Sequence, residues 1–117
     1  MKKLIIIISF FSFLSLFAQE GIYKVGNTTC TIESSHTYYK VYWENGTGYT
    51  SIIFKEQYPN GNEVFDEYDY KNNESIYVGS FIFKNDYYQS GIYIRDDGKE
   101  FKIKKLYRWP ISNFSLF

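Results

Sequence analysis

Residues 38–46, YYKVYWENG, alternate between two kinds of side chain and then end on an Asn-Gly pair. Tyr39, Val41 and Trp43 fall on one side of an extended strand, and the residues between them fall on the other. An Asn-Gly pair favours the tight turn between antiparallel strands, because both residues tolerate a positive φ. The segment therefore predicts a half-buried strand followed by a hairpin turn.

The same combination recurs along the rest of the chain. Turn pairs begin at Asn45, Asn60, Asn72, Asn85 and Asp97, about 12 to 15 residues apart. The runs between them are rich in Tyr, Phe, Ile and Val, which suit a pleated sheet, and none keeps a helical spacing for long. We expect eight strands, at about 21–25, 29–34, 37–43, 49–58, 63–70, 75–83, 87–95 and 100–107.

Connections this short join antiparallel neighbours, so the chain predicts an all-β fold with one up-and-down meander. We expect an eight-stranded barrel or a curled sheet, with aromatic rings filling the core in place of disulfides. Ile92 and Ile94 oppose Tyr93 on their strand, which fits one dry and one wet side. The strand at 75–83 is apolar on both sides, which predicts a central strand or one covered twice.

Two short motifs resemble known families. Gly21-Ile22-Tyr23 near the start and Arg108 near the end are similar to the pattern of lipocalin-type barrels, which prefer Trp where Tyr23 stands and are usually longer. The segment 58–61, YPNG, is similar to one MORN-type repeat, which the other turns do not reproduce. These likenesses cover only the residues quoted.

The N-terminus has the features of a secretory signal. Lys2 and Lys3 precede an apolar run at 4–17, and the small residue Ala18 follows. The run is short for a membrane span, which needs about 20 apolar residues. We therefore expect a signal peptide at 1–18, cleavage, and a secreted or periplasmic domain at 19–117 with no stable membrane span.

Charge and composition exclude several function classes. Basic and acidic residues balance at 13 each, so nothing attracts nucleic acid to the chain as a whole. The lysines of the segment 99–108 are expected to discourage pairing at a sheet edge rather than to bind a polyanion. One Cys and one His make neither an internal disulfide nor a zinc cage. We expect no metal site and no cofactor.

The single Cys and His do not point to catalysis either. Cys30 is expected to be a buried apolar filler, with a disulfide between two chains as the alternative. His36 is expected in a solvated turn, without the motif of a catalytic triad. No acid–base constellation is assembled, so we expect a protein that binds rather than an enzyme, with a hydrolase as the remaining alternative.

One carboxylate stands out within the strand at 63–70. Glu63, Phe65, Glu67 and Asp69 share one face of this strand, and Val64, Asp66, Tyr68 and Tyr70 share the other. If the second face points inward, Asp66 is a carboxylate among apolar and phenolic groups, which marks a candidate site. We expect a small apolar or sugar-like ligand in a pocket lined by Tyr39, Trp43, Phe54, Asp66 and Tyr68.

An alternative function needs no pocket. Tyr38 and Tyr42 share the outward side of their strand, and aromatic residues are frequent hot spots of protein interfaces. The chain would then be an envelope or periplasmic interaction module, either an inhibitor or a subunit. For the pocket hypothesis we expect a monomer.

Overall fold

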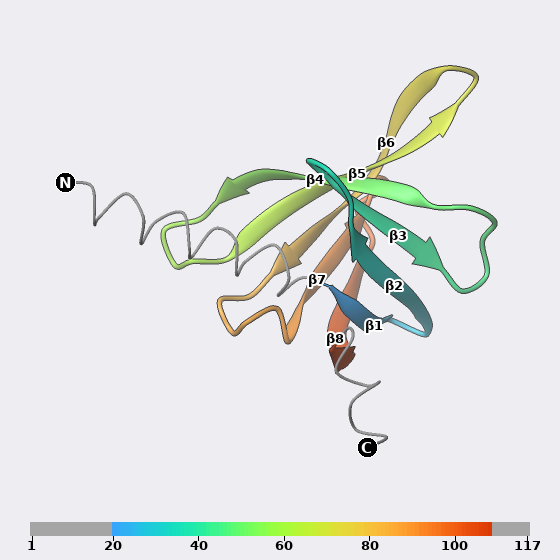
Figure 1. The fold of residues 1–117 in the computed structure, drawn as a ribbon. Helices are drawn as coiled ribbons and strands as arrows, with labels where there is room; N and C mark the ends of the chain where they lie inside the picture. Colours follow the sequence, from blue (N-terminus) through green and yellow to red (C-terminus); the bar gives the residue numbers. More distant parts are fainter. Residues whose placement is uncertain (1–19, 109–117) are drawn as a thin grey trace.

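The computed structural model describes residues 20–108, which form eight antiparallel strands that close into a barrel (Figure 1). The strands are β1 (Gly21–Val25), β2 (Thr28–Ser34), β3 (Tyr39–Trp43), β4 (Thr50–Gln57), β5 (Glu63–Lys71), β6 (Glu74–Phe83), β7 (Ser90–Arg95) and β8 (Glu100–Arg108). Each strand pairs with the next along the chain, and β8 also pairs with β1. The predicted all-β meander is confirmed, in its barrel form.

The predicted signal peptide at 1–18 lies outside the described residues. Within 20–108, no helix is long and apolar enough to cross a membrane. The predicted strand at 37–43 begins two residues late, at Tyr39, and the one at 87–95 begins at Ser90. Tyr87 and Tyr88 have a φ of 62°, a turn conformation that no strand residue adopts.

Turn chemistry explains how the strands reverse. Lys71 pairs with Glu74 across a two-residue turn in which Asn72 and Asn73 have φ values of 51° and 64°. Two consecutive positive φ values define the hairpin turn whose twist matches that of the flanking strands, and Asn tolerates this conformation better than most residues. The Asn pair at this position therefore sets the register of the β5–β6 hairpin.

The barrel has two different ends. The turns after β1, β3, β5 and β7 gather at one end, called here the open end, and those after β2, β4 and β6 gather at the packed end. In Figure 1 the turns after β1 and β3 lie on the right, and those after β4 and β6 lie on the left. This arrangement follows from the meander, because successive turns must alternate between the two ends.

The β5–β6 hairpin projects beyond the barrel wall (Figure 1). β4 pairs with β5 only as far as Tyr68, and β7 pairs with β6 only from Gly79 onward. Residues 69–71 and 74–76 pair only with each other, and Ile76 and Tyr77 are more than two-fifths exposed. The prediction that the whole of 75–83 is central or covered twice is therefore wrong for its first half.

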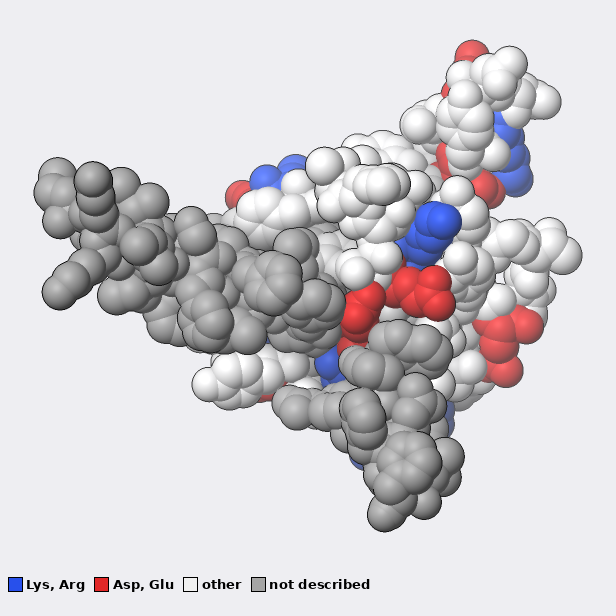
Figure 2. Space-filling view, viewed as in Figure 1, with Lys and Arg blue, Asp and Glu red and all other residues white. Residues whose placement is uncertain are grey.

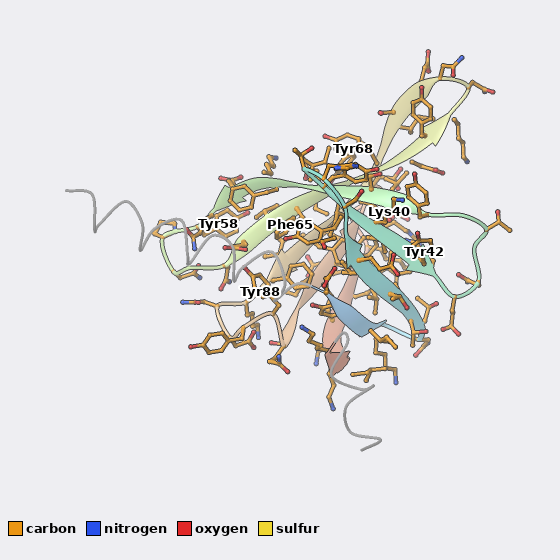
Figure 3. All side chains as sticks on the ribbon, viewed as in Figure 1. Lys40, Tyr42, Tyr58, Phe65, Tyr68 and Tyr88 are labelled. Carbon is orange, nitrogen blue, oxygen red and sulfur yellow. The ribbon has the colours of Figure 1, made fainter. Side chains whose placement is uncertain are left out.

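Aromatic and aliphatic side chains fill the barrel. The ring centroids of Phe65 and Phe83 lie 5.7 Å apart, and those of Phe81 and Tyr93 lie 4.8 Å apart. Figure 3 shows Phe65 inside the barrel. The buried core consists of Tyr23, Val25, Cys30, Ile32, Tyr39, Val41, Ile52, Phe65, Phe81, Phe83, Tyr88, Tyr93 and Ile103. The predicted ring-filled core and the buried position of Cys30 are confirmed.

Two predictions about the barrel wall are corrected. Tyr93 points inward and is 7% exposed, so the isoleucines on either side of it form the outer face of β7. Tyr93 points inward because its cross-strand partners lie on the same face of the sheet. These partners are Phe81 on β6 and Phe101 on β8, whose rings face the core. Because β8 has a partner on both sides, its lysines protect no sheet edge.

Buried tyrosines make the stability of the fold depend on alkaline pH. Burial raises the pKa of Tyr23, Tyr39 and Tyr93. Cys30 raises the pKa of Tyr23 further, and Glu67 raises that of Tyr93. Because the folded-state pKa lies above the unfolded value of about 10, this stability is present below pH 10 and is lost as the pH rises beyond it. We expect the urea midpoint to fall steadily above about pH 10.

The measurement is a set of urea titrations from pH 8 to 11, with tyrosinate absorbance at 295 nm followed in parallel. The three buried rings should ionise only when the protein unfolds. Complete ionisation near pH 10 with an unchanged urea midpoint would contradict the buried positions.

Candidate functional site

A cavity of about 830 Å³ opens at the open end of the barrel. The turns after β1, β3 and β7 form its rim, and side chains of β3, β5, β7 and β8 form its walls. It is lined by Val25, Gly26, Asn27, Thr28, Trp43, Glu44, Asn45, Thr50, Glu67, Asp69, Val78, Tyr93, Arg95, Asp96 and Phe101. Its size is in the range of small-molecule sites, and apolar walls with a few polar groups are typical of them.

Glu67 contributes a buried carboxylate to the cavity lining. Its side chain is inside the barrel and is 1% exposed. Its Oε2 accepts hydrogen bonds from the Trp43 indole Nε1–H at 2.8 Å and from the Thr50 hydroxyl at 2.5 Å. Its Oε1 accepts one from the Tyr93 hydroxyl at 2.5 Å. Three donors from three strands therefore replace the water that a carboxylate loses on burial.

Close packing around Tyr93 holds this network in place. The Tyr93 ring lies 5.4 Å from the Trp43 ring and 4.8 Å from the Phe81 ring, centroid to centroid. A β-carbon built on Gly79 would lie 2.5 Å from the Tyr93 hydroxyl oxygen, so only glycine leaves room for it. Burial and the hydrogen bond to Glu67 raise the pKa of Tyr93, which keeps this hydroxyl protonated as a donor at neutral pH.

Charged side chains surround the mouth of the cavity. Glu44 accepts hydrogen bonds from the Thr29 amide at 2.7 Å and from the Thr28 hydroxyl at 3.2 Å, and these lower its pKa. Asp69 and Asp96 also line the cavity. Arg95 is the one basic residue of this lining, and its guanidinium binds Asp97 at 2.7 Å. The mouth therefore carries an excess of negative charge.

The five residues predicted to line one pocket do not lie together. Trp43 lines the cavity, and Tyr39 is buried in the core, outside the cavity lining. Phe54, Asp66 and Tyr68 line a separate groove of about 310 Å³ on the outside of the barrel, which Ile53, Lys55 and Ser75 complete. Figure 3 shows Tyr68 at the outer edge of the barrel, away from the interior where Phe65 lies.

Asp66 is not the inward carboxylate. It lies between Phe65 and Glu67 on β5, and because both of those point inward, Asp66 points outward. The Ser80 hydroxyl donates to its Oδ1 at 2.8 Å and is itself 2.6 Å from the Tyr77 hydroxyl. The alternation along 63–70 correctly separates the residues of β5 into two faces, but the inward face is the one that carries Phe65 and Glu67, not the one that carries Asp66.

Tyr38 and Tyr42 lie on the outer face, as the alternation of β3 predicts. The Tyr42 ring lies 5.7 Å from the Tyr49 ring, and the Lys40 ammonium is 4.7 Å from the centre of the Tyr49 ring. A hydrogen bond with Ser35 lowers the pKa of Tyr38. Figure 3 shows Lys40 and Tyr42 on the β3 side of the barrel.

The residues with the most familiar chemistry lie away from the cavity. His36 is exposed in the turn between β2 and β3, at the packed end. Cys30 is buried, and burial followed by the charge of Glu67 raises the pKa of its thiol, which makes it a poor nucleophile at neutral pH. Among the described residues, no three His, Cys, Asp or Glu side chains are arranged to hold a metal ion.

The sequence analysis did not identify Glu67, Tyr93 or Phe101 as site residues. The candidate site at Asp66 requires the face of β5 opposite Glu67 to point inward, and the hydropathy of β7 predicts that Tyr93 lies on its wet face. Nothing in the sequence marks Phe101 as part of a cavity wall.

Comparison with known proteins gives no assignment. No protein-family model, no curated protein sequence and no solved structure matches the chain. The likenesses to lipocalin-type barrels and to a MORN-type repeat therefore rest on the quoted residues alone. The function is therefore inferred from the cavity and the side chains that line it.

The Tyr93 hydroxyl should contribute measurably to stability. Tyr93→Phe keeps the ring packing but leaves Glu67 Oε1 without its donor, so we expect a loss of about 1–3 kcal/mol in the free energy of unfolding. Urea denaturation provides the measurement. The control is Tyr87→Phe, which deletes a hydroxyl from a ring that is 80% exposed in the turn after β6 and should cost less than about 0.5 kcal/mol. Equal losses in the two variants would contradict the buried network.

Proposed function

We propose that the protein is a small, exported, monomeric binding protein that holds a small apolar or sugar-like molecule in the cavity at the open end. The observation that carries the proposal is a concave site whose aromatic wall surrounds one fixed carboxylate. Trp43, Tyr93 and Phe101 contribute aromatic side chains to the cavity lining, and Glu67 contributes a carboxylate. Sites of this composition are the usual ligand sites of small barrels.

These side chains support ligand binding better than they support catalysis. General acid–base work needs a titratable group within hydrogen-bond reach of the substrate. The single imidazole of the chain lies in the turn between β2 and β3, at the other end of the barrel from the cavity. Glu67 already accepts three hydrogen bonds, so it is better suited to orient a ligand than to transfer a proton.

The proposal is tested by NMR titration of ¹⁵N-labelled protein, as the expressing cell processes it, with water-soluble aromatic, aliphatic and sugar probes. We expect saturable shifts of the Trp43 indole N–H and the Thr50 amide, with little change at Phe54 and Tyr68 in the outer groove. Phe101→Leu should weaken binding at least fivefold, and the control Phe54→Leu less than twofold. If no probe moves the Trp43 signal, the cavity is not a binding site.

The outer surface supports a second candidate function, that of a protein-interaction module. Tyr42 and Tyr49 form an aromatic pair with Lys40 over one ring, and exposed apolar side chains continue along β4 and the projecting hairpin. On the face in Figure 2, acidic and basic side chains are scattered among uncharged ones rather than gathered by sign. Such a mixed, aromatic surface is typical of protein interfaces.

This candidate predicts one stoichiometric partner in an envelope extract. Tyr42→Ala should abolish its recovery in a pull-down, because truncation of an interface aromatic often costs 2 kcal/mol or more. Tyr87→Ala is the matched control, because this ring is 80% exposed in the turn at the packed end. Recovery that is unchanged by Tyr42→Ala, or equally lost in both variants, would argue against the Tyr42 surface.

A further inference from the structure

The cavity has a strong charge asymmetry. Four carboxylates line it, those of Glu44, Glu67, Asp69 and Asp96, against the single guanidinium of Arg95. Arg95 is paired with a fifth carboxylate, Asp97, and Asp69 has a long contact of 3.6 Å with the Lys71 ammonium. A concave site with an excess of one charge concentrates the opposite charge and repels its own. The cavity therefore favours a cation over an anion.

The surroundings of Glu67 give a second, more specific reason to expect a cation in the cavity. Its three hydrogen-bond donors, two hydroxyls and an indole, are all neutral, and among residues 20–106 no Lys or Arg is paired with it. A carboxylate offers about four lone-pair positions, and Glu67 uses three of them in these hydrogen bonds. Burial of a charge without a counter-ion is costly, and a cation brought by a ligand would remove that cost.

The aromatic wall points to an organic cation rather than a metal ion. Trp43, Tyr93 and Phe101 succeed one another along it, with ring centroids 5.4 Å and 6.4 Å apart. The negative face of an aromatic ring attracts ammonium and guanidinium groups, most strongly where water is excluded. The chain itself demonstrates this at the rim, because the Arg95 guanidinium lies 5.5 Å from the centre of the Phe101 ring.

We propose that the ligand of this cavity is an organic cation, an amine or guanidine carried on an apolar body, whose charged group lies against Trp43 and Glu67. This inference rests on the proposed function and specifies its ligand class. The carboxylates attract the positive charge of the ligand. The aromatic rings contact both its apolar body and its charged group. Neutral and anionic ligands of the same shape bind more weakly.

The first experiment compares three probes that differ mainly in charge: 2-phenylethylamine, 2-phenylethanol and phenylacetate. Each is titrated at pH 7 into ¹⁵N-labelled protein, as the expressing cell processes it, and followed at the Trp43 indole N–H. We expect the amine to bind at least tenfold more tightly than the alcohol, and phenylacetate to bind most weakly. Equal affinity for amine and alcohol, or stronger binding of phenylacetate, overturns the cation proposal and leaves the proposed function standing. Binding of none of the three overturns the cation proposal, and the proposed function falls as well only if the aliphatic and sugar probes also leave the Trp43 signal unchanged.

The second experiment removes the charge of Glu67 and keeps its shape. In Glu67→Gln the amide oxygen can accept from Trp43 and Thr50, and the amide nitrogen can donate to the Tyr93 hydroxyl. We expect affinity for 2-phenylethylamine to fall at least tenfold and affinity for 2-phenylethanol to change less than twofold. The control Glu63→Gln alters an acceptor of the Tyr88 hydroxyl at the packed end and should change neither affinity more than twofold.

A rim variant keeps the proposal testable if Glu67→Gln does not fold. Asp96 is exposed at the cavity mouth, so Asp96→Asn should leave the fold intact. We expect it to lower the affinity for the amine two- to fivefold and to leave that for the alcohol unchanged. Unchanged amine affinity in Asp96→Asn, or in a folded Glu67→Gln, overturns the proposal.

Discussion

The hydrogen bonds to the Glu67 carboxylate fix the arrangement of the open half of the barrel. A carboxylate removed from water is stable only where donors take the place of the solvent. Trp43, Thr50 and Tyr93 supply these donors from β3, β4 and β7, so one group on β5 orients side chains of three other strands. The same side chains form part of the cavity wall, so the fold of the open half and the shape of the cavity depend on one set of contacts.

The two ends of the barrel differ because its interior is small. Eight strands enclose a space that large side chains can just fill. Tyr23, Phe65 and Phe83 pack against one another on the packed side, with centroid distances of 5.5 Å and 5.7 Å to the Phe83 ring. The remaining space lies at the open end, where short turns and carboxylates surround it. The packed half is therefore filled by large side chains, and the open half contains the cavity.

Local alternation was enough to predict the meander and the inward face of β3, where Tyr39, Val41 and Trp43 contrast with their neighbours. It was not enough for β5, because both faces of that strand carry acidic and aromatic residues. What decides the inward face is the set of donors to Glu67, which lie 17 to 26 residues away in the sequence. Hydropathy similarly predicts that the isoleucines of β7 face the core. In the structure Tyr93 faces the core instead, because its hydroxyl donates a hydrogen bond to Glu67 inside the barrel.

The most direct test of this account is a ¹⁵N-edited NOESY spectrum that observes the Trp43 indole N–H. If this group donates to Glu67 beside Thr50 and Tyr93, it should give cross-peaks to the Thr50 methyl group and to the Tyr93 ring protons. It should also exchange with solvent far more slowly than free indole. An indole signal that exchanges at the free rate, with no cross-peak to either residue, would contradict the buried carboxylate and the cavity built around it.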